Sequence, residues 1–316
     1  STIIEDVDNL ARAVNMLDRL KPPARSMNEV IMNGTAASDA TLQVSSGSLA
    51  PIAASDARTL VCSLDVLGFL SQHKWLPTGL MGGGLVVELE LNSDAAYATT
   101  GSTDWVVENP VIFANEKILD SQLQEKMVQH VLSGKSMPIS IKSMTTTLHV
   151  VTGQDFTLAL ARGFSRLDAI ILTLYDSTQS GTKAMNTFFH PAGAAGALSK
   201  SGDAVKLQVQ IGSKKYPEYE ISSVAEFYMR LQDTLGIMDG ESSMNISGRQ
   251  YHDNAFIAAL NLEKLSGTGA EYSGINSKEQ LLTASWKGTG SANQCYVTLV
   301  YSAIVNIKEG GVELLE

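Results

Sequence analysis

The chain has 316 residues, of which 44% are hydrophobic and 18% charged, and its formal net charge is −10. It is too apolar for a disordered protein, and its acidic balance excludes a protein that coats nucleic-acid phosphates with clustered Lys and Arg. No apolar stretch reaches the ~20 residues of a membrane-spanning helix, and no secretory signal opens the sequence. We therefore expect a soluble protein of two modules, made in the cell interior, without sequence-specific nucleic-acid binding.

Residues 3–20 predict an amphipathic helix. Spacings of four and three place five apolar side chains on one helical face; they are Ile3, Val7, Leu10, Val14 and Leu17. The next residues, Pro22 and Pro23, end the helix because proline lacks the amide donor. We expect residues 1–25 to form an N-terminal arm. The arm either packs on its own domain or docks on a neighbouring subunit or a membrane, although its acidic polar face argues against anionic lipid.

From residue 26 the pattern changes to short strands between clusters of Gly, Ser and Asn. The clearest strand covers residues 84–91, where apolar residues alternate with Glu88 and Glu90 in the period of two that marks a half-buried strand. A helix is predicted over 120–132, since Ser121 and Gln124 have capping-box spacing and Gly134 fits the C-terminal cap. Other strands of this half are predicted at 42–46, 58–64, 104–107, 110–114, 139–151, 156–161 and 169–175.

The second half repeats this order after a connecting segment over 177–203. A helix is predicted over 223–236, with Ser223 and Glu226 forming a capping box and Gly236 ending it. Strands are predicted at 205–211, 244–250, 255–262, 280–287 and 295–307. Because both halves run strands, one helix, then strands, we expect two similar β-sandwiches side by side.

Residue types that could carry chemistry are present but dispersed. The segment 133–136 ends like a phosphate-binding loop, yet Gln129 stands where that loop needs glycine, and a helix precedes it instead of a strand. No two histidines have metal-ligand spacing; they are His73, His130, His149, His190 and His252. We therefore expect no catalytic residues, no metal and no cofactor.

Three further motifs receive the simpler interpretation. Glu88 and Glu90 could resemble a glycosidase pair, but they fit the solvated face of a strand better. The lysines and tyrosines of 214–219 resemble a single-stranded nucleic-acid binder, but in acidic surroundings a subunit contact or a turn is favoured. Cys62 and Cys295 fit two buried free thiols better than a disulfide.

Several segments together resemble the double jelly-roll major capsid proteins of polinton-like viruses and virophages. The resemblance covers residues 58–307, in order. The first-module segments are Trp75-Leu76-Pro77, Leu80-Met81-Gly82-Gly83 with 85–89, Asp120 to Gly134 with Ser136-Met137-Pro138-Ile139, and residues 164–170. The second-module segments are Tyr216-Pro217-Glu218-Tyr219, residues 223–231, residues 256–264 and Tyr272-Ser273-Gly274-Ile275-Asn276-Ser277. Residues 1–35 match nothing in this family.

The resemblance implies a mainly β fold of two tandem antiparallel eight-stranded jelly rolls, each with one amphipathic helix. The first would cover 26–178, and the second 179–316 including the connecting segment. Three copies would form a pseudo-hexagonal capsomer, and capsomers would tile an icosahedral DNA-virus shell. Partners would be neighbouring capsomers, penton proteins and minor capsid proteins, and the protein would reside in the virion. The arm would lie at the inner base of the shell.

Two other classes remain as alternatives. A carbohydrate- or receptor-binding β-sandwich, such as a lectin or fibre module, needs aromatic side chains grouped on one face. Trp75, Trp105 and Trp286 are instead scattered along the chain. A cupin-like enzyme needs clustered histidine ligands.

Overall fold

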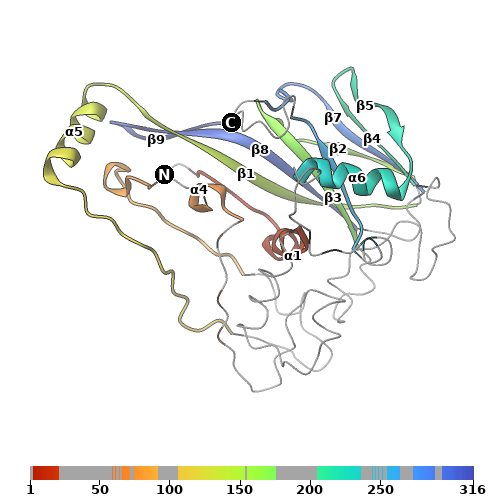
Figure 1. Cartoon of the computed structure of the whole chain (residues 1–316), viewed down its shortest axis with the longest axis horizontal. Helices are drawn as coiled ribbons and strands as arrows, with labels where there is room; N and C mark the ends of the chain where they lie inside the picture. Colours follow the sequence, from red (N-terminus) through yellow and green to blue (C-terminus); the bar gives the residue numbers. More distant parts are fainter. Residues whose placement is uncertain are drawn as a thin grey trace.

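The computed structural model has a mainly β fold with two antiparallel sheets and few helices (Figure 1). It describes residues 3–20, 66–71, 75–91, 106–153, 155–175, 205–235, 255–263, 273–288 and 294–316, and the single positions 59, 61, 64, 244, 246, 248 and 251.

One sheet, which we call sheet A, contains the two longest strands. Its order is β1-β8-β3-β6, and β9 pairs with the outer part of β8. The strands are β1 (Met137–Val150), β3 (Leu167–Tyr175), β6 (Ile257–Asn261), β8 (Gln294–Lys308) and β9 (Gly311–Leu315). All of β3 is buried, as its continuous apolar run predicts for a central strand.

The second sheet, sheet B, has the order β2-β7-β4-β5. Its strands are β2 (Phe156–Leu160), β4 (Lys206–Ile211), β5 (Lys214–Ile221) and β7 (Leu282–Lys287). Along β4 every second residue is buried, because apolar residues alternate with polar ones. One face of sheet B therefore faces the core, and the other carries the polar side chains.

The strand pairing is nested. The first strand pairs with the eighth and the third with the sixth in sheet A, while the second pairs with the seventh and the fourth with the fifth in sheet B. Successive pairs thus alternate between two facing sheets, which is the wrapping of an eight-stranded jelly roll. Pairing of β3 with β8 and of β4 with β7 completes the sheets.

Aromatic side chains fill the space between the sheets and one helix. The helix α6 (Val224–Leu235) packs along β6 and buries Phe227 and Leu231. The Phe227 ring stacks on Trp286 at 5.9 Å between centroids and meets Phe256 edge-on at 5.3 Å. The predicted cap is confirmed, since the amide of Glu226 donates to Ser223 Oγ at 3.1 Å.

The other helices whose bounds the structure describes lie in the N-terminal part. They are α1 (Leu10–Leu20), α4 (Gly68–Ser71), the short 3-10 turn η1 (Thr78–Leu80) and α5 (Ser121–Leu132). The N-cap of α5 is Asp120, whose carboxylate accepts from the amide of Gln122. Gly134 has a φ of +79°, which confirms it as the C-terminal cap.

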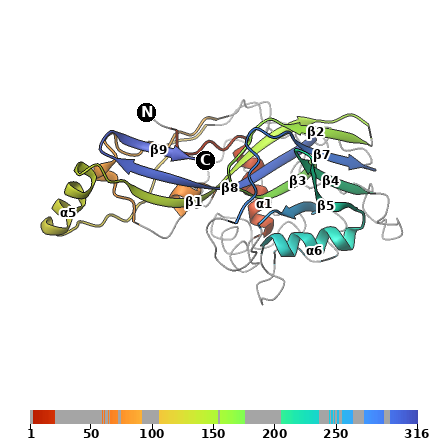
Figure 2. The same ribbon diagram turned by 90° about the horizontal axis from the view of Figure 1, so that it is seen from above.

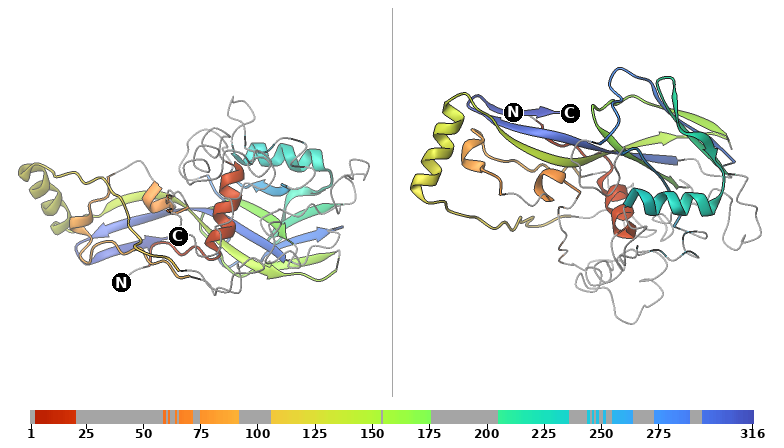
Figure 3. Two further views of the ribbon diagram at one scale, coloured as in Figure 1. Left: turned by 90° about the horizontal axis from the view of Figure 1, so that it is seen from below. Right: turned by 45° about the horizontal axis from the view of Figure 1, so that its top comes forward.

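Sheet A extends beyond the sandwich on one side. β3 pairs with β8 only as far as Tyr301, while β1 continues beside β8 to Ile307 and β9 adds a third strand there. We call this extension, residues 137–142, 302–308 and β9, the projection. Figures 2 and 3 show it reaching away from the sandwich towards α5. One of its faces is buried, as the alternation of Ile139, Ile141, Ala303, Val305 and Ile307 requires.

The expected division into 26–178 and 179–316 does not follow the strand pairing. The border falls between β3 and β4, and strands on both sides of it pair in each sheet: β1 with β8, and β2 with β7. In the part of the chain that the structure describes, residues 137–308 form one jelly roll, so the tandem arrangement is not confirmed.

Seven predicted strands and two predicted helices after residue 119 match the observed elements, while β5 and β9 were not predicted. Lys214 to Tyr219, interpreted as a contact or turn, belong to β5. The predicted strands at 84–91 and 110–114 are extended but pair with no strand, and the described positions of 244–250 form none. The predictions at 42–46 and 104–105 and the connecting segment 177–203 lie outside the described residues, as do four of the seven positions of 58–64; the other three form no strand.

Candidate assembly surfaces

The helix predicted for the arm begins later than expected. Residues 3–9 are not helical, and Asn9, with a φ of +55°, directly precedes α1. Glu5 accounts for the difference, because its carboxylate accepts from the amides of Gly68 and Phe69 at 2.9 and 2.8 Å. These amides begin the short helix α4, so Glu5 satisfies donors that have no partner within that helix.

The five predicted arm residues do not form one buried face. Val14 is 39% exposed and Ile3 73% exposed, Val7 and Leu10 are half-buried, and Leu17 packs against the core. Among the positions of α1 whose burial is described, the buried ones are instead Ala13, Met16 and Arg19. Arg12 holds the helix to sheet A, since its guanidinium lies 4.2 Å from the Tyr175 ring and 5.5 Å from the Tyr296 ring. The arm thus packs on its own sheet and still presents Ile3 and Val14 to solvent.

Three of the segments that carry the family resemblance meet at one corner of sheet A. Leu167 and Ile275 exchange two backbone hydrogen bonds of 2.9 Å. Ser277, which is fully buried, accepts from the amide of Phe164 and donates to its carbonyl oxygen. The amide of Leu262, after β6, donates to the carbonyl of Asp168. Segments 164–170, 256–264 and 272–277, distant in sequence, therefore form one unit.

The Asp168 side chain lies at the centre of this corner. It is only 2% exposed, accepts a hydrogen bond from Ser302 Oγ, and has the Lys142 ammonium 3.8 Å away. Burial raises the pKa of Asp168, against the lowering effects of Ser302 and Lys142. Lys142 also pairs with Glu263 at 2.6 Å. Through Ser302 and Lys142, Asp168 ties β3 to β8 and β1.

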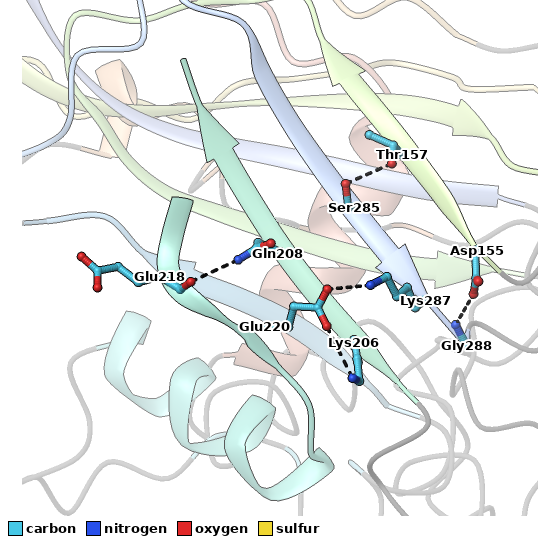
Figure 4. Close-up of polar contacts among 9 residues, drawn as sticks. All are labelled: Asp155, Thr157, Lys206, Gln208, Glu218, Glu220, Ser285, Lys287 and Gly288. Atoms are coloured by element: carbon cyan, nitrogen blue, oxygen red, sulfur yellow. Dashed lines mark hydrogen bonds and ion pairs between the residues drawn. The ribbon is translucent and has the colours of Figure 1, made fainter. Parts of the chain in front are cut away.

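The outer face of sheet B is polar. Figure 4 shows Glu220 between two lysines of neighbouring strands, with distances of 2.6 Å to Lys287 and 3.4 Å to Lys206. The hydrogen bond from Lys287 lowers the pKa of Glu220. Thr157 and Ser285 hydrogen-bond across β2 and β7 on this sheet at 3.0 Å. A face of exposed ion pairs and hydroxyls is already well solvated and offers little apolar area for stacking.

Beside this face lies a group of basic, aromatic and apolar side chains on β5 and α6. Tyr219 is 57% exposed, and Met229 is 48% exposed. Arg230 donates to the Tyr219 hydroxyl at 2.6 Å and pairs with Glu226 at 3.3 Å. We call Tyr219, Met229 and Arg230, with the exposed Lys214 and Lys215, the β5–α6 patch. Tyr, Met and Arg are the residue types that interfaces favour.

A second surface lies on the opposite side of the molecule. Residues 84–91 and 106–119, which we call the acidic flank, are extended, exposed throughout and pair with no strand. They hold 12 of the 24 large hydrophobic side chains that are exposed in the described residues, including Val86 (82%), Phe113 (88%) and Ile118 (93%). Such a concentration of exposed apolar surface marks an interaction site. The sequence placed Glu88 and Glu90 on a strand, but both lie on this flank.

The described residues contain no group of three or more side chains that could hold a metal ion. His130 and His149 lie on separate elements, α5 and β1, and the other three histidines fall outside the described residues. The segment that resembles a phosphate-binding loop lies at the C-terminal end of α5. Cys295 is a buried free thiol whose pKa is raised by burial, whereas Cys62 lies outside the described residues.

None of the helices that the structure describes is both long and apolar enough to cross a membrane. Aromatic residues do not gather on one face among the described residues either: Trp286 is buried in the core, and Trp75 is exposed beneath Lys117.

Comparison with known proteins gives structural neighbours only. No family model matches the chain, and no curated protein does. Solved structures similar to it are viral capsid proteins. The PBCV-1 virus capsid matches at 11% identity with a TM-score of 0.42, covering 63% of this chain and 55% of that one. PBCV-1 VP54, fitted into a reconstruction of the virophage Sputnik, matches at 12% identity with a TM-score of 0.40.

The Sputnik virophage structure itself matches at 9% identity with a TM-score of 0.35, covering 57% of this chain and 38% of that chain. The chain spans about half the length of the PBCV-1 proteins that it matches.

Proposed function

We propose that the chain is a structural protein of a virus shell and performs no catalysis. The observation that carries the proposal is the corner of sheet A, where three family-like segments meet on a jelly roll with nested strand pairing. Two of the segments, 164–170 and 272–277, are joined there by backbone hydrogen bonds between Leu167 and Ile275. A chance resemblance of short motifs gives no reason for them to be joined in space.

The surfaces support the same role. A shell protein works by self-association, which requires surfaces that favour contact between copies. The acidic flank and the β5–α6 patch have the exposed apolar and aromatic side chains that such contacts need. The alternative of a carbohydrate-binding module receives no support from the aromatic side chains that the structure describes.

In this proposal three copies form a pseudo-hexagonal capsomer, and capsomers tile an icosahedral shell in the virion. The penton and minor capsid proteins are further partners, and the arm contributes through Ile3 and Val14, its exposed apolar residues. A pseudo-hexagonal trimer needs two sandwiches per chain. The jelly roll described here accounts for one of them, so the number of copies in a ring tests this part of the proposal.

Negative-stain microscopy combined with mass photometry of the purified chain tests the proposal. We expect rings with a hexagonal outline, or larger particles, and a ring mass of three times 33.8 kDa. Rings of twice that mass would mean six copies with one sandwich each, and would contradict the trimer while retaining the shell. Monomers under all conditions, with binding to a glycan array, would favour the carbohydrate-binding alternative.

A further inference from the structure

The acidic flank exposes more apolar surface than an isolated protein normally does. Its 12 exposed large hydrophobic side chains present on the order of 1,000 Å² of apolar area, which is comparable to a specific protein interface. The backbone of both segments is extended and makes no strand pairs, so it gains no stabilisation from a sheet of its own chain.

The charge of the flank restricts its partner. It carries four carboxylates, Glu88, Glu90, Glu108 and Glu116, and one basic residue, Lys117. A partner surface should therefore be basic and contain apolar or aromatic side chains.

The β5–α6 patch of the same chain has these properties. Lys214, Lys215 and Arg230 balance the neighbouring acids Glu218, Glu226 and Asp233, so this surface is much less acidic than the chain as a whole, whose charge is −10. Tyr219 and Met229 add exposed apolar area. Lys206 and Lys287 extend the positive charge across sheet B, where Glu220 is the acid between them.

The two surfaces lie at opposite ends of the molecule. Figure 1 shows α5, which directly follows the flank, at one end of the longest axis, and β5 and α6 at the other. A chain cannot bring its own flank to its own patch. Two copies can do so head to tail, which leaves one free flank and one free patch for the next copy and allows a ring to close.

We infer that the acidic flank of one copy docks on the β5–α6 patch of the next copy. This inference rests on the proposed function and names the surfaces by which copies associate. Contact is made through side chains, because Pro217 in the edge strand β5 has no amide to donate to an added strand.

The test uses two complementary variants of the full chain. The flank variant carries Glu88→Lys and Phe113→Lys, and the patch variant carries Lys215→Glu and Met229→Glu. All four residues are exposed, so the fold should tolerate the changes. The control for the flank variant carries Glu309→Lys and Val150→Lys, and the control for the patch variant carries Lys308→Glu and Val150→Glu; each makes the same kinds of change at exposed positions outside both surfaces. Circular dichroism checks that each variant is folded.

Sedimentation velocity then measures association. We expect the wild-type chain and both controls to self-associate, and each variant alone to show an apparent dissociation constant at least tenfold higher. An equimolar mixture of the two variants should form a dimer and nothing larger, because the intact flank of the patch variant fits the intact patch of the flank variant.

The possible results separate the two levels of the proposal. If either variant associates as its control does, or if the mixture stays monomeric, the head-to-tail contact is overturned. Hexagonal rings formed by both variants would leave the shell role in place and remove only this contact. A wild-type chain that remains monomeric at all concentrations overturns both.

Discussion

Asp168 and Gly274 show how single residues hold distant segments of this chain together. Asp168 is buried beside Ser302 and Lys142, and the segment from Ser273 to Ser277 covers it. Gly274 permits this close approach because it has no side chain. The resemblance includes Asp168 in the segment 164–170, but it does not predict that this side chain is buried. An aspartate at the start of an apolar strand gives the same sequence pattern whether or not another segment covers it.

Gly274→Ala should destabilise this corner. A Cβ atom there would lie 2.4 Å from Asp168 Oδ1 and 3.0 Å from the carbonyl oxygen of Leu167, so the segment must move. We expect a loss of about 1–3 kcal/mol in the free energy of unfolding, as for other overpacked sites, measured by urea denaturation. Gly310→Ala is the control, because a Cβ atom there meets nothing within 4 Å. Equal midpoints for the two variants would contradict the packing described.

Asp168→Asn should change how stability depends on pH. Since burial raises the pKa of Asp168, the folded protein holds this proton more tightly than the unfolded chain does. The contribution of Asp168 to stability is therefore present at low pH and is lost as the pH rises through its unfolded and then its folded pKa. Relative to wild type, the asparagine variant should gain stability as the pH rises above the ordinary pKa of an aspartate, about 3.9.

Urea denaturation at a series of pH values measures this difference. Asp6→Asn serves as its control, because Asp6 is exposed and its replacement removes one surface carboxyl. If the stability of Asp168→Asn relative to wild type falls with rising pH, or changes in parallel with that of Asp6→Asn, Asp168 is not held in a dehydrated site.

At the scale of elements, periodicity predicted most of the strands that pair within the chain. It failed where contacts with another segment determine whether a stretch forms a paired strand. β1, β3, β4 and β8 were predicted closely, because each has a core face of its own chain against it. Residues 84–91 have an equally clear alternation but lie exposed. A period of two shows that a segment has one apolar face, and it does not show which surface covers that face.

The two strands that were missed have weaker patterns for identifiable reasons. β5 carries lysines, tyrosines and Pro217 on an edge, where burial imposes little alternation. β9 is short and is stabilised by pairing with β8. The late start of α1 depends on a contact between Glu5 and α4, which are distant in sequence.

Glu5→Ala should loosen α4 without unfolding the sandwich. The substitution leaves the amides of Gly68 and Phe69 without their carboxylate acceptor, and hydrogen bonds to a charged group contribute roughly 1.5–3 kcal/mol. We expect faster hydrogen exchange at residues 68–71, with unchanged protection in β3 and β8. Asp6→Ala removes an exposed neighbouring carboxylate and is the matched control. Identical exchange at residues 68–71 in both variants would rule out this role for Glu5.

On the scale of the whole molecule, the sequence predicted a mainly β protein of two sandwiches, and the tandem arrangement is not confirmed in the described residues. Two halves with the same order of strands, helix and strands suggested two sandwiches, whereas the first and last strands of the described jelly roll lie side by side. In a nested pairing, contacts connect residues as far apart as Met137 and Ile307, and local patterns contain no information about such contacts. The surfaces were predicted only in part, since exposure depends on that arrangement.

Net charge and local charge should make self-association depend on salt in two opposing ways. At a formal charge of −10, copies repel one another over the ~30 Å Debye length at 0.01 M salt. At 0.15 M the Debye length is about 8 Å, so this long-range repulsion is screened while contacts between the acidic flank and the β5–α6 patch persist. At 1 M the Debye length is about 3 Å, and these contacts weaken too. The apparent dissociation constant should therefore pass through a minimum near 0.15 M NaCl.

Sedimentation velocity over this range of NaCl concentrations measures the curve. Glu309→Lys changes the net charge from −10 to −8 away from both surfaces, so it should strengthen association at 0.01 M and have little effect at 1 M. For the flank variant, association should no longer weaken between 0.15 M and 1 M NaCl, because this variant lacks the flank–patch attraction that high salt screens. If overall repulsion between copies limits assembly, screening it should first strengthen association. Association that weakens steadily from 0.01 M upward would therefore contradict this role of the net charge.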